Sequence, residues 1–379
     1  MVVYVDISSA VHAKAGLGRY SENLVRELRP LLGGRLRLFQ NSLGRLGPLP
    51  AWESYPTAGV RLGYKPWRAT VLAAQVLHWP MDRLIPEATL FHATEHLLPS
   101  FEHIPTVLTV HDLVFERYPQ HHKALNYFYL RAAMPLYCQR ASAVIAVSEA
   151  TKTDLIAFYR LDARKITVIP EATASHFAPQ PAELVAAVRR RYNLPQRYIL
   201  AVSTIEPRKN LDRLADACGP LIGEGLVDGL VLVGKKGWLY EGFLRHLEEL
   251  PWRKKVILPG FVCEEDLPAI YSGAMITAQP SLYEGFGLPV LEAMACGSPV
   301  CASSASSLPE VGGDAARYFD PLRTEEMTDA LRTLLHDTAL RAEMRAQGLA
   351  RAARFSWRYT AEQTLALYER VIQMQGQRK

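Results

Sequence analysis

The segment PSLYEGFGLPVLEAMACGSPV, residues 280–300, follows an apolar run at 274–278 and leads into a second one at 300–302. Two glycines flank a phenylalanine where the first run gives way to a helical pattern. Pro289 suits the first turn of that helix, because its missing N–H has no partner there anyway. Unpaired N–H groups at a helix start, together with the positive end of the helix dipole, bind phosphate. The segment therefore predicts a strand, a phosphate-binding loop and a helix.

Two carboxylates accompany this loop: Glu284 lies within it and Glu292 lies in the following helix. A carboxylate repels phosphate but accepts hydrogen bonds from hydroxyl groups. The combination indicates a ligand that carries both phosphates and sugars. The alternative is an ordinary strand–loop–helix unit in which both glutamates are solvated.

Length and composition set the class of protein. A chain of 379 residues exceeds one ordinary core, so two domains are expected, and 49% hydrophobic with 21% charged residues is typical of a globular protein. No apolar run approaches the ~20 residues that span a bilayer, and MVVYVDISSA predicts a first strand rather than a signal peptide. Five cysteines without a CxxC pair argue against structural zinc and favour a reduced, cytoplasmic location.

The net charge of +5 lies entirely within residues 1–178. This excess of positive charge would suit an anionic acceptor or the anionic lipids at the inner face of the cell membrane. A solvated basic face with no partner is an equal alternative. Residues 61–83 are the best candidate membrane surface, with basic and aromatic side chains at Arg61, Lys65, Trp67, Arg68 and Trp79. A helix packed on the sheet is the alternative there. No nucleic-acid partner is expected.

Short apolar strands alternate with helices through both halves of the chain, and the alternation predicts α/β domains with parallel sheets covered on both faces. The rhythm breaks over residues 171–196. We predict an N-terminal Rossmann-like acceptor domain (1–178), a linker with a helix (179–196), a C-terminal Rossmann-like donor domain (197–355) and a final helix (356–379). Two such domains in tandem imply a cleft between them.

Three further strand ends carry polar or glycine-rich loops: AGLGR at 15–19, His111-Asp112 after the strand 107–110, and STIEPRKN at 203–210. Glycine at 16 would let a ligand approach the backbone closely. A histidine at a strand end can donate to developing negative charge, although it is more often simply packed. Arg208 and Lys209 could neutralise a diphosphate, whereas an exposed basic pair alone is weak evidence.

Together these features resemble the retaining nucleotide-sugar glycosyltransferases of the GT-B fold, in glycosyltransferase family four. The resemblance covers nearly the whole chain. Its most specific part is Glu284-x7-Glu292 within residues 280–300. Supporting matches, in the family's order, are AGLGRY (15–20), VHDL (110–113), AVSEATK (146–152), TIEPRKN (204–210) and GKKGW (234–238).

The resemblance implies a set of donor-binding residues: Gly16, Ser203, Arg208, Lys209, Gly285, Phe286, Gly287, Leu288 and Glu292. Glu292 would hold the ribose hydroxyls, and the backbone of 285–288 would cradle the diphosphate. The residues implied in catalysis are His111, Arg208, Lys209 and Glu284. His111 would lie near the anomeric centre, Glu284 would contact donor-sugar hydroxyls, and the two cations would balance charge on the leaving diphosphate.

Some positions depart from the family pattern. Ser203-Thr204 stand where the family often has an arginine. In the absence of that arginine, Arg208 and Lys209 would have to supply more of the phosphate binding. The family's frequent Asn-Gly-Val-Asp loop is replaced by residues 171–174, Glu-Ala-Thr-Ala. Ala15 replaces the first glycine of a frequent pair.

The resemblance therefore predicts a retaining hexosyltransferase of polysaccharide biosynthesis that acts on a glycan or lipid-linked acceptor. It favours GDP-mannose as donor, with UDP-sugars open. No Asp-x-Asp metal signature is present, so neither a metal nor a cofactor is expected. A sugar-nucleotide epimerase of the same fold and a non-catalytic sugar-nucleotide-binding protein are the alternatives; a dehydrogenase is disfavoured, because no GxGxxG follows a strand. We also expect the final helix to return to the N-terminal domain.

Overall fold

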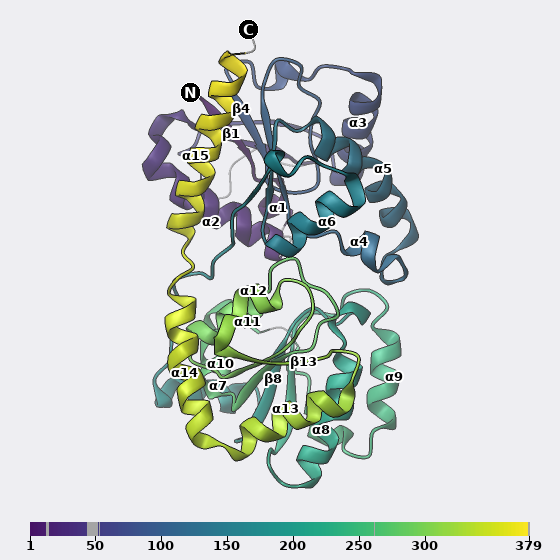
Figure 1. Cartoon of the computed structure of the whole chain (residues 1–379), viewed down its shortest axis with the longest axis vertical. Helices are drawn as coiled ribbons and strands as arrows, with labels where there is room; N and C mark the ends of the chain where they lie inside the picture. Colours follow the sequence, from purple (N-terminus) through teal and green to yellow (C-terminus); the bar gives the residue numbers. More distant parts are fainter. Residues whose placement is uncertain (13–14, 44–51, 53, 261, 378–379) are drawn as a thin grey trace. The chain divides into compact units, whose positions relative to one another are not determined.

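The computed structural model describes residues 1–12, 15–43, 52, 54–260 and 262–377. The chain forms two compact α/β units (Figure 1). Unit 1 consists of Met1–Glu116, Ala124–Glu171 and Ser356–Lys379, and unit 2 consists of Arg117–Lys123 and Ala172–Phe355. The sequence-based boundary at residue 178 thus falls inside unit 2.

Unit 1 is built on seven parallel strands in the order β3-β2-β1-β4-β5-β6-β7. The strands are β1 (Val3–Asp6), β2 (Leu36–Asn41), β3 (Thr57–Val60), β4 (Leu90–Ala93), β5 (Thr106–Val110), β6 (Ala143–Ala146) and β7 (Ile166–Val168). The helices are α1 (Ser8–Val11), α2 (Ala15–Leu32), α3 (Tyr64–Leu77), α4 (Val114–Arg117), α5 (Ala124–Arg140), α6 (Glu149–Tyr159) and α15 (Trp357–Gly376).

Side chains alternate between the two faces of this sheet, as the pleat requires. Tyr4, Phe91 and Leu108 join a buried cluster with Trp67 of α3 and Met134 of α5. The opposite face is covered by α2 and α15, which pack against each other. The final helix therefore returns to the first α/β unit, as predicted (Figure 1).

Unit 2 is built on six parallel strands in the order β10-β9-β8-β11-β12-β13. The strands are β8 (Tyr198–Val202), β9 (Gly229–Val233), β10 (Val256–Ile257), β11 (Ile276–Gln279), β12 (Val300–Ser303) and β13 (Ala316–Phe319). The helices are α7 (Ala182–Arg191), α8 (Leu211–Gly223), α9 (Glu241–Glu249), α10 (Leu267–Gly273), α11 (Leu288–Ala295), α12 (Leu308–Gly312), α13 (Thr324–His336) and α14 (Thr338–Ala352).

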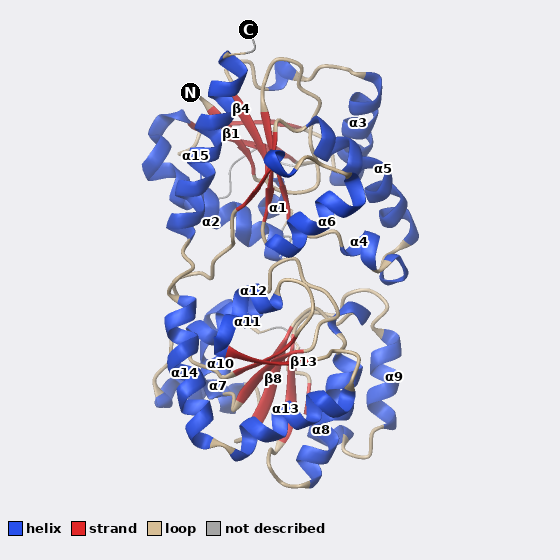
Figure 2. Cartoon of the chain, in the orientation of Figure 1, coloured by secondary structure: helices blue, strands red, loops and turns tan. Residues whose placement is uncertain are grey.

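Helices also cover both faces of the second sheet (Figure 2). α8 packs against α13, while α7 packs against α10 and α11 packs against α14. The two parallel sheets confirm the predicted pair of Rossmann-like domains.

Two details differ from the sequence-based prediction. The edge strand β3 was not predicted; it pairs with β2, and a Cβ at Gly59 would lie 2.3 Å from the carbonyl oxygen of Gln40. The sequence pattern over residues 324–353 predicts one helix, whereas the structure has two, α13 and α14. Asp337 separates them, and its side chain accepts a hydrogen bond from the backbone N–H of Leu340 at the start of α14.

Candidate active site

The predicted donor loops meet at the centre of the unit 2 sheet. β8 and β11 are neighbours there, although the chain runs from β8 outward to β9 and β10 before it returns to β11. This reversal of strand order is the point at which open α/β sheets bind ligands, at the carboxyl ends of the strands. The loops 203–210 and 280–287 follow those two ends.

The loop before α11 is held by side chains of residues 306–308. Ser307 donates from its hydroxyl to the carbonyl oxygens of Glu284 (2.9 Å) and Phe286 (2.6 Å). The Ser306 hydroxyl accepts from the N–H of Glu284 at 2.8 Å. Gly287 has a φ of 116°, a conformation that disfavours any side chain, and a Cβ there would lie 2.8 Å from Leu308. These contacts fix the path of the backbone into the first turn of α11.

The predicted charged residues form a buried cluster between the two loops. Lys209 Nζ donates to Glu284 Oε1 at 2.6 Å, and Arg208 Nη1 donates to Glu284 Oε2 at 2.8 Å. Arg208 Nη2 donates to Glu206 Oε1 at 2.6 Å. The Arg208 and Lys209 side chains are only 13% and 10% exposed. The alternative of an exposed basic pair is therefore wrong.

Two neutral side chains complete the environment of Glu284. Gln279 Nε2 and Ser281 Oγ both donate to Glu284 Oε1, at 2.8 and 2.6 Å. Burial by itself raises the pKa of this carboxyl, but the charges of Lys209 and Arg208 and the hydrogen bonds outweigh it and lower the pKa to about 2. Burial lowers the pKa of Lys209, with a further contribution from Arg208. Glu284 is thus a carboxylate at any physiological pH.

Glu292 lies on α11 and is 4% exposed. The hydroxyl of Tyr271, on α10, donates to its Oε2 at 2.8 Å. A carboxylate can accept several hydrogen bonds, so this contact fixes one oxygen and is compatible with further donors. Phe286 is buried and its ring packs edge-on against Phe355 at 5.9 Å, so only its backbone is suited to contact a ligand.

Ser203 directly follows β8, and its side-chain hydroxyl is in an unusual environment. Its Oγ is buried and has no hydrogen-bond partner among the described residues. Buried hydroxyls are normally hydrogen-bonded, and one that lacks a partner at a strand end suits a polar ligand.

A segment from between α4 and α5 belongs to unit 2 and packs beside these loops. The Tyr118 hydroxyl donates to the carbonyl oxygen of Leu282 at 3.4 Å, and the Tyr118 ring stacks on His121. The carbonyl oxygen of His121 accepts from Trp238 Nε1. Trp238 of the GKKGW run therefore anchors the segment 117–123. The sequence did not predict this contact.

His111 lies at the end of β5 in unit 1, and both of its ring nitrogens are engaged. Nδ1 lies 2.7 Å from Glu171 Oε1, and Nε2 lies 2.9 Å from the carbonyl oxygen of Thr94. The Tyr20 ring packs edge-on against the imidazole at 4.7 Å. Burial lowers the pKa of His111, but the hydrogen bond and charge of Glu171 outweigh it, so the pKa is raised. The geometry is that of an imidazolium that donates from both nitrogens.

The other predicted N-terminal residue, Gly16, lies in the first turn of α2, one turn before Tyr20. It is exposed, and no described atom lies within 4 Å of a Cβ built on it. Ser148, part of the AVSEATK match, is the N-cap of α6, and its Oγ accepts from the N–H of Thr151 at 3.1 Å. The Thr151 hydroxyl in turn donates to the carbonyl oxygen of His111 at 3.3 Å. This match therefore supports the position of the histidine.

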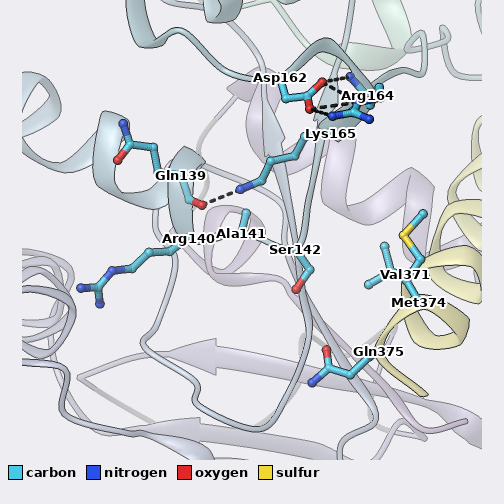
Figure 3. A pocket seen from close by; sticks show the side chains of 10 residues that line it. All are labelled: Gln139, Arg140, Ala141, Ser142, Asp162, Arg164, Lys165, Val371, Met374 and Gln375. Carbon is cyan, nitrogen blue, oxygen red and sulfur yellow. Dashed lines mark hydrogen bonds and ion pairs between the residues drawn. The ribbon is translucent and has the colours of Figure 1, made fainter. Parts of the chain in front are cut away.

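A pocket of about 620 Å³ lies elsewhere in unit 1, between the end of α5, the turn before β7 and the last turns of α15 (Figure 3). Its cations already have partners: Lys165 Nζ donates to the carbonyl oxygen of Gln139 at 2.5 Å, and Arg164 pairs with Asp162 at 2.6 Å. It adjoins the amino ends of β6 and β7, opposite the edge that carries His111. We do not place the reaction there.

The described residues contain no group of three or more His, Cys, Asp or Glu side chains arranged to hold a metal ion. No helix in this part of the chain is long and apolar enough to cross a bilayer.

Comparison with known proteins shows which family the chain resembles. Residues 187–351 match the family model described as Glycosyl transferases group 1, and residues 15–173 match the model described as Glycosyltransferase Family 4. The O-antigen chain mannosyltransferase B of Escherichia coli is 33% identical over 265 residues, which cover 69% of this chain and 70% of that protein.

A second relative, the serotype-specific mannosyltransferase WbdA of Escherichia coli, is 33% identical over 62% of this chain but only 29% of its own length. The crystal structure of Anabaena Alr3699/HepE in complex with UDP and glucose superimposes with a TM-score of 0.74 at 20% identity, covering 97% of this chain and 99% of that one. At that identity the likeness shows the fold alone.

These matches place the chain in the class of glycosyltransferases with the GT-B fold, as the two parallel sheets had indicated. Within that class, the chain belongs to glycosyltransferase family four.

Proposed function

We propose that the protein is a retaining glycosyltransferase that moves mannose from GDP-mannose to a glycan or lipid-linked acceptor. The observation that carries the proposal is the buried pair of cations, Arg208 and Lys209, beside the loop that starts α11 at the switch point of unit 2. The two mannosyltransferase relatives favour mannose as the transferred sugar.

The chemistry requires negative charge to be stabilised on the departing diphosphate while the anomeric C–O bond breaks. Preorganised donors in a water-poor site do this best. Arg208, Lys209 and the backbone N–H groups of 285–288 would supply them, with the positive end of the α11 dipole. Because these groups can carry the charge, we propose that turnover needs neither a divalent metal nor another cofactor. Activity should persist in the presence of EDTA.

The carboxylates would hold the hydroxyl groups of the donor. Glu292, braced by Tyr271, would bind the ribose. Glu284 Oε2 accepts from Arg208 alone among the described residues, which leaves that oxygen able to accept from a hydroxyl of the donor sugar. We further propose that the acceptor attacks from the side of the leaving group, and that a phosphate oxygen takes its proton. This route retains the anomeric configuration.

The test is a donor screen on the purified protein. Binding and slow hydrolysis of labelled GDP-mannose, in preference to UDP-glucose and UDP-N-acetylglucosamine, would support the proposal. Preference for a UDP-sugar would change the donor but keep the reaction. Epimerisation of the donor without an acceptor would show an isomerase, and binding of none of the three would overturn the proposal. NMR of the product gives the anomeric configuration.

We also propose that the protein works in the cytoplasm, at the inner face of the membrane. The five cysteines are all free, four of them buried, as expected in a reduced compartment. Trp79 is 64% exposed and Leu77, at the end of α3, is 71% exposed. Trp67, which the sequence grouped with this surface, is 1% exposed and packs against Phe39, so its assignment to the membrane surface was wrong.

Flotation with vesicles tests the membrane contact. The wild-type protein should float with vesicles that contain anionic lipid and not with neutral ones, and salt should weaken the association. Trp79→Ala should reduce it, whereas Trp67→Phe, a change in the core, should not. Absence of binding to anionic vesicles at low salt would overturn this part of the proposal.

A further inference from the structure

Glu206 is a buried carboxylate that the sequence-based site did not include. It lies four residues past β8, and its side chain is 2% exposed. Among the described residues, its carboxylate accepts from one group, Arg208 Nη2, at 2.6 Å. A buried carboxylate with a single charged partner depends on that partner to stay ionised.

The cluster as a whole is electrically balanced. Two cations, Arg208 and Lys209, face two carboxylates, Glu206 and Glu284. The two carboxylates are not equivalent. Glu284 accepts from both cations and from two neutral side chains, while Glu206 accepts from Arg208 alone. If a ligand adds negative charge to the cluster, Glu206 is therefore the carboxylate that is protonated first.

A sugar nucleotide adds such charge. Its diphosphate bridge carries two negative charges, and a phosphate oxygen that pairs with Arg208 must share the guanidinium with Glu206. Like charges in a buried site cannot all remain ionised, and a proton taken up by one of them removes the repulsion. Burial already raises the pKa of Glu206, whereas the pKa of Glu284 is lowered to about 2.

We propose that Glu206 takes up one proton from solvent when the diphosphate of the donor binds Arg208. Glu206 is then a positioning residue, which acts on the ligand through Arg208. In the free protein, Glu206 forms an ion pair with the guanidinium of Arg208. In the complex, Glu206 is a neutral acid, and the guanidinium forms its ion pair with the phosphate instead. The inference rests on the proposed function, since it requires a diphosphate ligand at this loop.

Other charged groups also lie around Glu206. Lys209 and Glu284 are the remaining members of the cluster, and the GKKGW run approaches Glu206 at Gly237, where a Cβ would lie 3.6 Å from that of Glu206. His121, on the segment 117–123, is the rival proton acceptor. Burial, and then the charge of Arg208, lower its pKa, while the charge of Asp212 opposes this. A diphosphate on Arg208 would favour its protonation as well.

Calorimetry separates these possibilities. GDP-mannose and UDP-glucose are titrated into the full-length protein in three buffers of different ionisation enthalpy, at about pH 7.5. Neither donor has a phosphate group that titrates near neutrality, so the slope of the binding enthalpy against the buffer enthalpy counts protons taken up by the protein. We expect uptake of about one proton in the wild type.

Three variants locate the proton. Glu206→Gln should abolish the uptake. His121→Gln should keep it, and so should Asp266→Asn, which removes another buried carboxylate paired with an arginine in unit 2. Binding of either donor without proton uptake, or loss of uptake in His121→Gln, would overturn the inference while the proposed function stands. Binding of neither donor would overturn both.

The wild type provides a second measurement in case Glu206→Gln does not fold. Where one proton is taken up on binding, Kd should rise tenfold for each unit of pH. A Kd that stays constant between about pH 6 and pH 9 would overturn the inference without any variant.

Discussion

Both sheets carry charged groups just past the carboxyl ends of their strands, but the groups are held differently. In unit 1, His111 has one carboxylate partner, Glu171, and one backbone partner. In unit 2, Arg208 and Lys209 share two carboxylates within a cluster that also takes in Gln279 and Ser281. In the unit 1 pair, Glu171 and one backbone carbonyl oxygen hold a single imidazolium in a fixed position. The unit 2 cluster can exchange partners, which suits a site that must receive a diphosphate and release it.

Breaking the unit 2 cluster should have the largest effect. Glu284→Gln leaves Lys209 and Arg208 buried with one carboxylate between them. Loss of one partner from a buried ion pair typically costs about 3–5 kcal/mol of unfolding free energy. Urea denaturation measures it, and turnover of the preferred donor should fall by about 10²–10³-fold.

The matched control for this variant is Glu326→Gln, which removes an exposed pair with Arg323 at 2.5 Å. It should cost less than about 1 kcal/mol. Equal stability of the two variants would show that the cluster contributes little to folding.

Breaking the unit 1 pair should cost less. Glu171→Gln keeps the shape of the side chain but removes the charge that favours the imidazolium, and hydrogen bonds to charged groups contribute about 1.5–3 kcal/mol. A double-mutant cycle with His111→Gln should give a coupling energy of about 0.5–3 kcal/mol. Additive effects would mean that the 2.7 Å contact does not link the two residues energetically.

The pH dependence of stability should separate the two regions. The pKa of Glu284 is lowered from 4.5 to about 2, so its contribution is present above pH 4.5 and is lost as the pH falls toward about 2. The pKa of His111 is raised above 6.5, so its contribution is complete below pH 6.5 and is lost as the pH rises through the raised value. Each should give a slope of up to about 1.4 kcal/mol per pH unit.

Unfolding free energies between pH 2 and pH 9 measure both limbs. Glu284→Gln should flatten only the acid limb, and His111→Gln only the alkaline limb. A variant that flattens the opposite limb, or neither, would show that other groups control the pH dependence.

The smallest effect on stability should come from Gly16. Since no described atom lies near a Cβ at this position, Gly16→Ala should change the free energy of unfolding by less than about 0.5 kcal/mol. Gly18→Ala is the matched control: a Cβ there would lie 3.3 Å from Ser9 and Ala10 and should cost about 1 kcal/mol. If a donor approaches the start of α2, only Gly16→Ala should raise KM with stability unchanged.

The same contrast explains what the sequence could predict. The unit 2 loops follow adjacent strands, and their main residues lie within 203–210 and 280–292, so the strand-end pattern together with the family resemblance placed Arg208, Lys209 and Glu284 in one predicted site. In unit 1, Glu171 follows His111 by sixty residues, and five helices and strands (α4, α5, β6, α6 and β7) lie between them, so only the folded sheet brings the two side chains into contact. Local motifs reveal a site whose residues lie in short loops after adjacent strands, but not a pair of single residues that only the fold brings together.

The burial of polar side chains was the other property that the sequence could not predict. Glu206 was visible within TIEPRKN, but nothing in its spacing showed that its carboxylate is enclosed and bound to Arg208. Tyr271 and Gln279, which brace the two glutamates, are residue types common in any core. β3 has four residues, one of them glycine, too few for its period to stand out.

The membership of α15 in unit 1 has a consequence for folding during synthesis. Tyr368 on this helix hydrogen-bonds to the buried His92 of β4 at 2.6 Å, so the first sheet lacks part of its cover until residues 357–376 have been made. Most of unit 2, Ala172–Phe355, leaves the ribosome earlier and lies within the sequence of unit 1. The unit that begins first is thus completed last, and a chain that stops short of α15 should expose part of one face of its N-terminal sheet to chaperones and proteases.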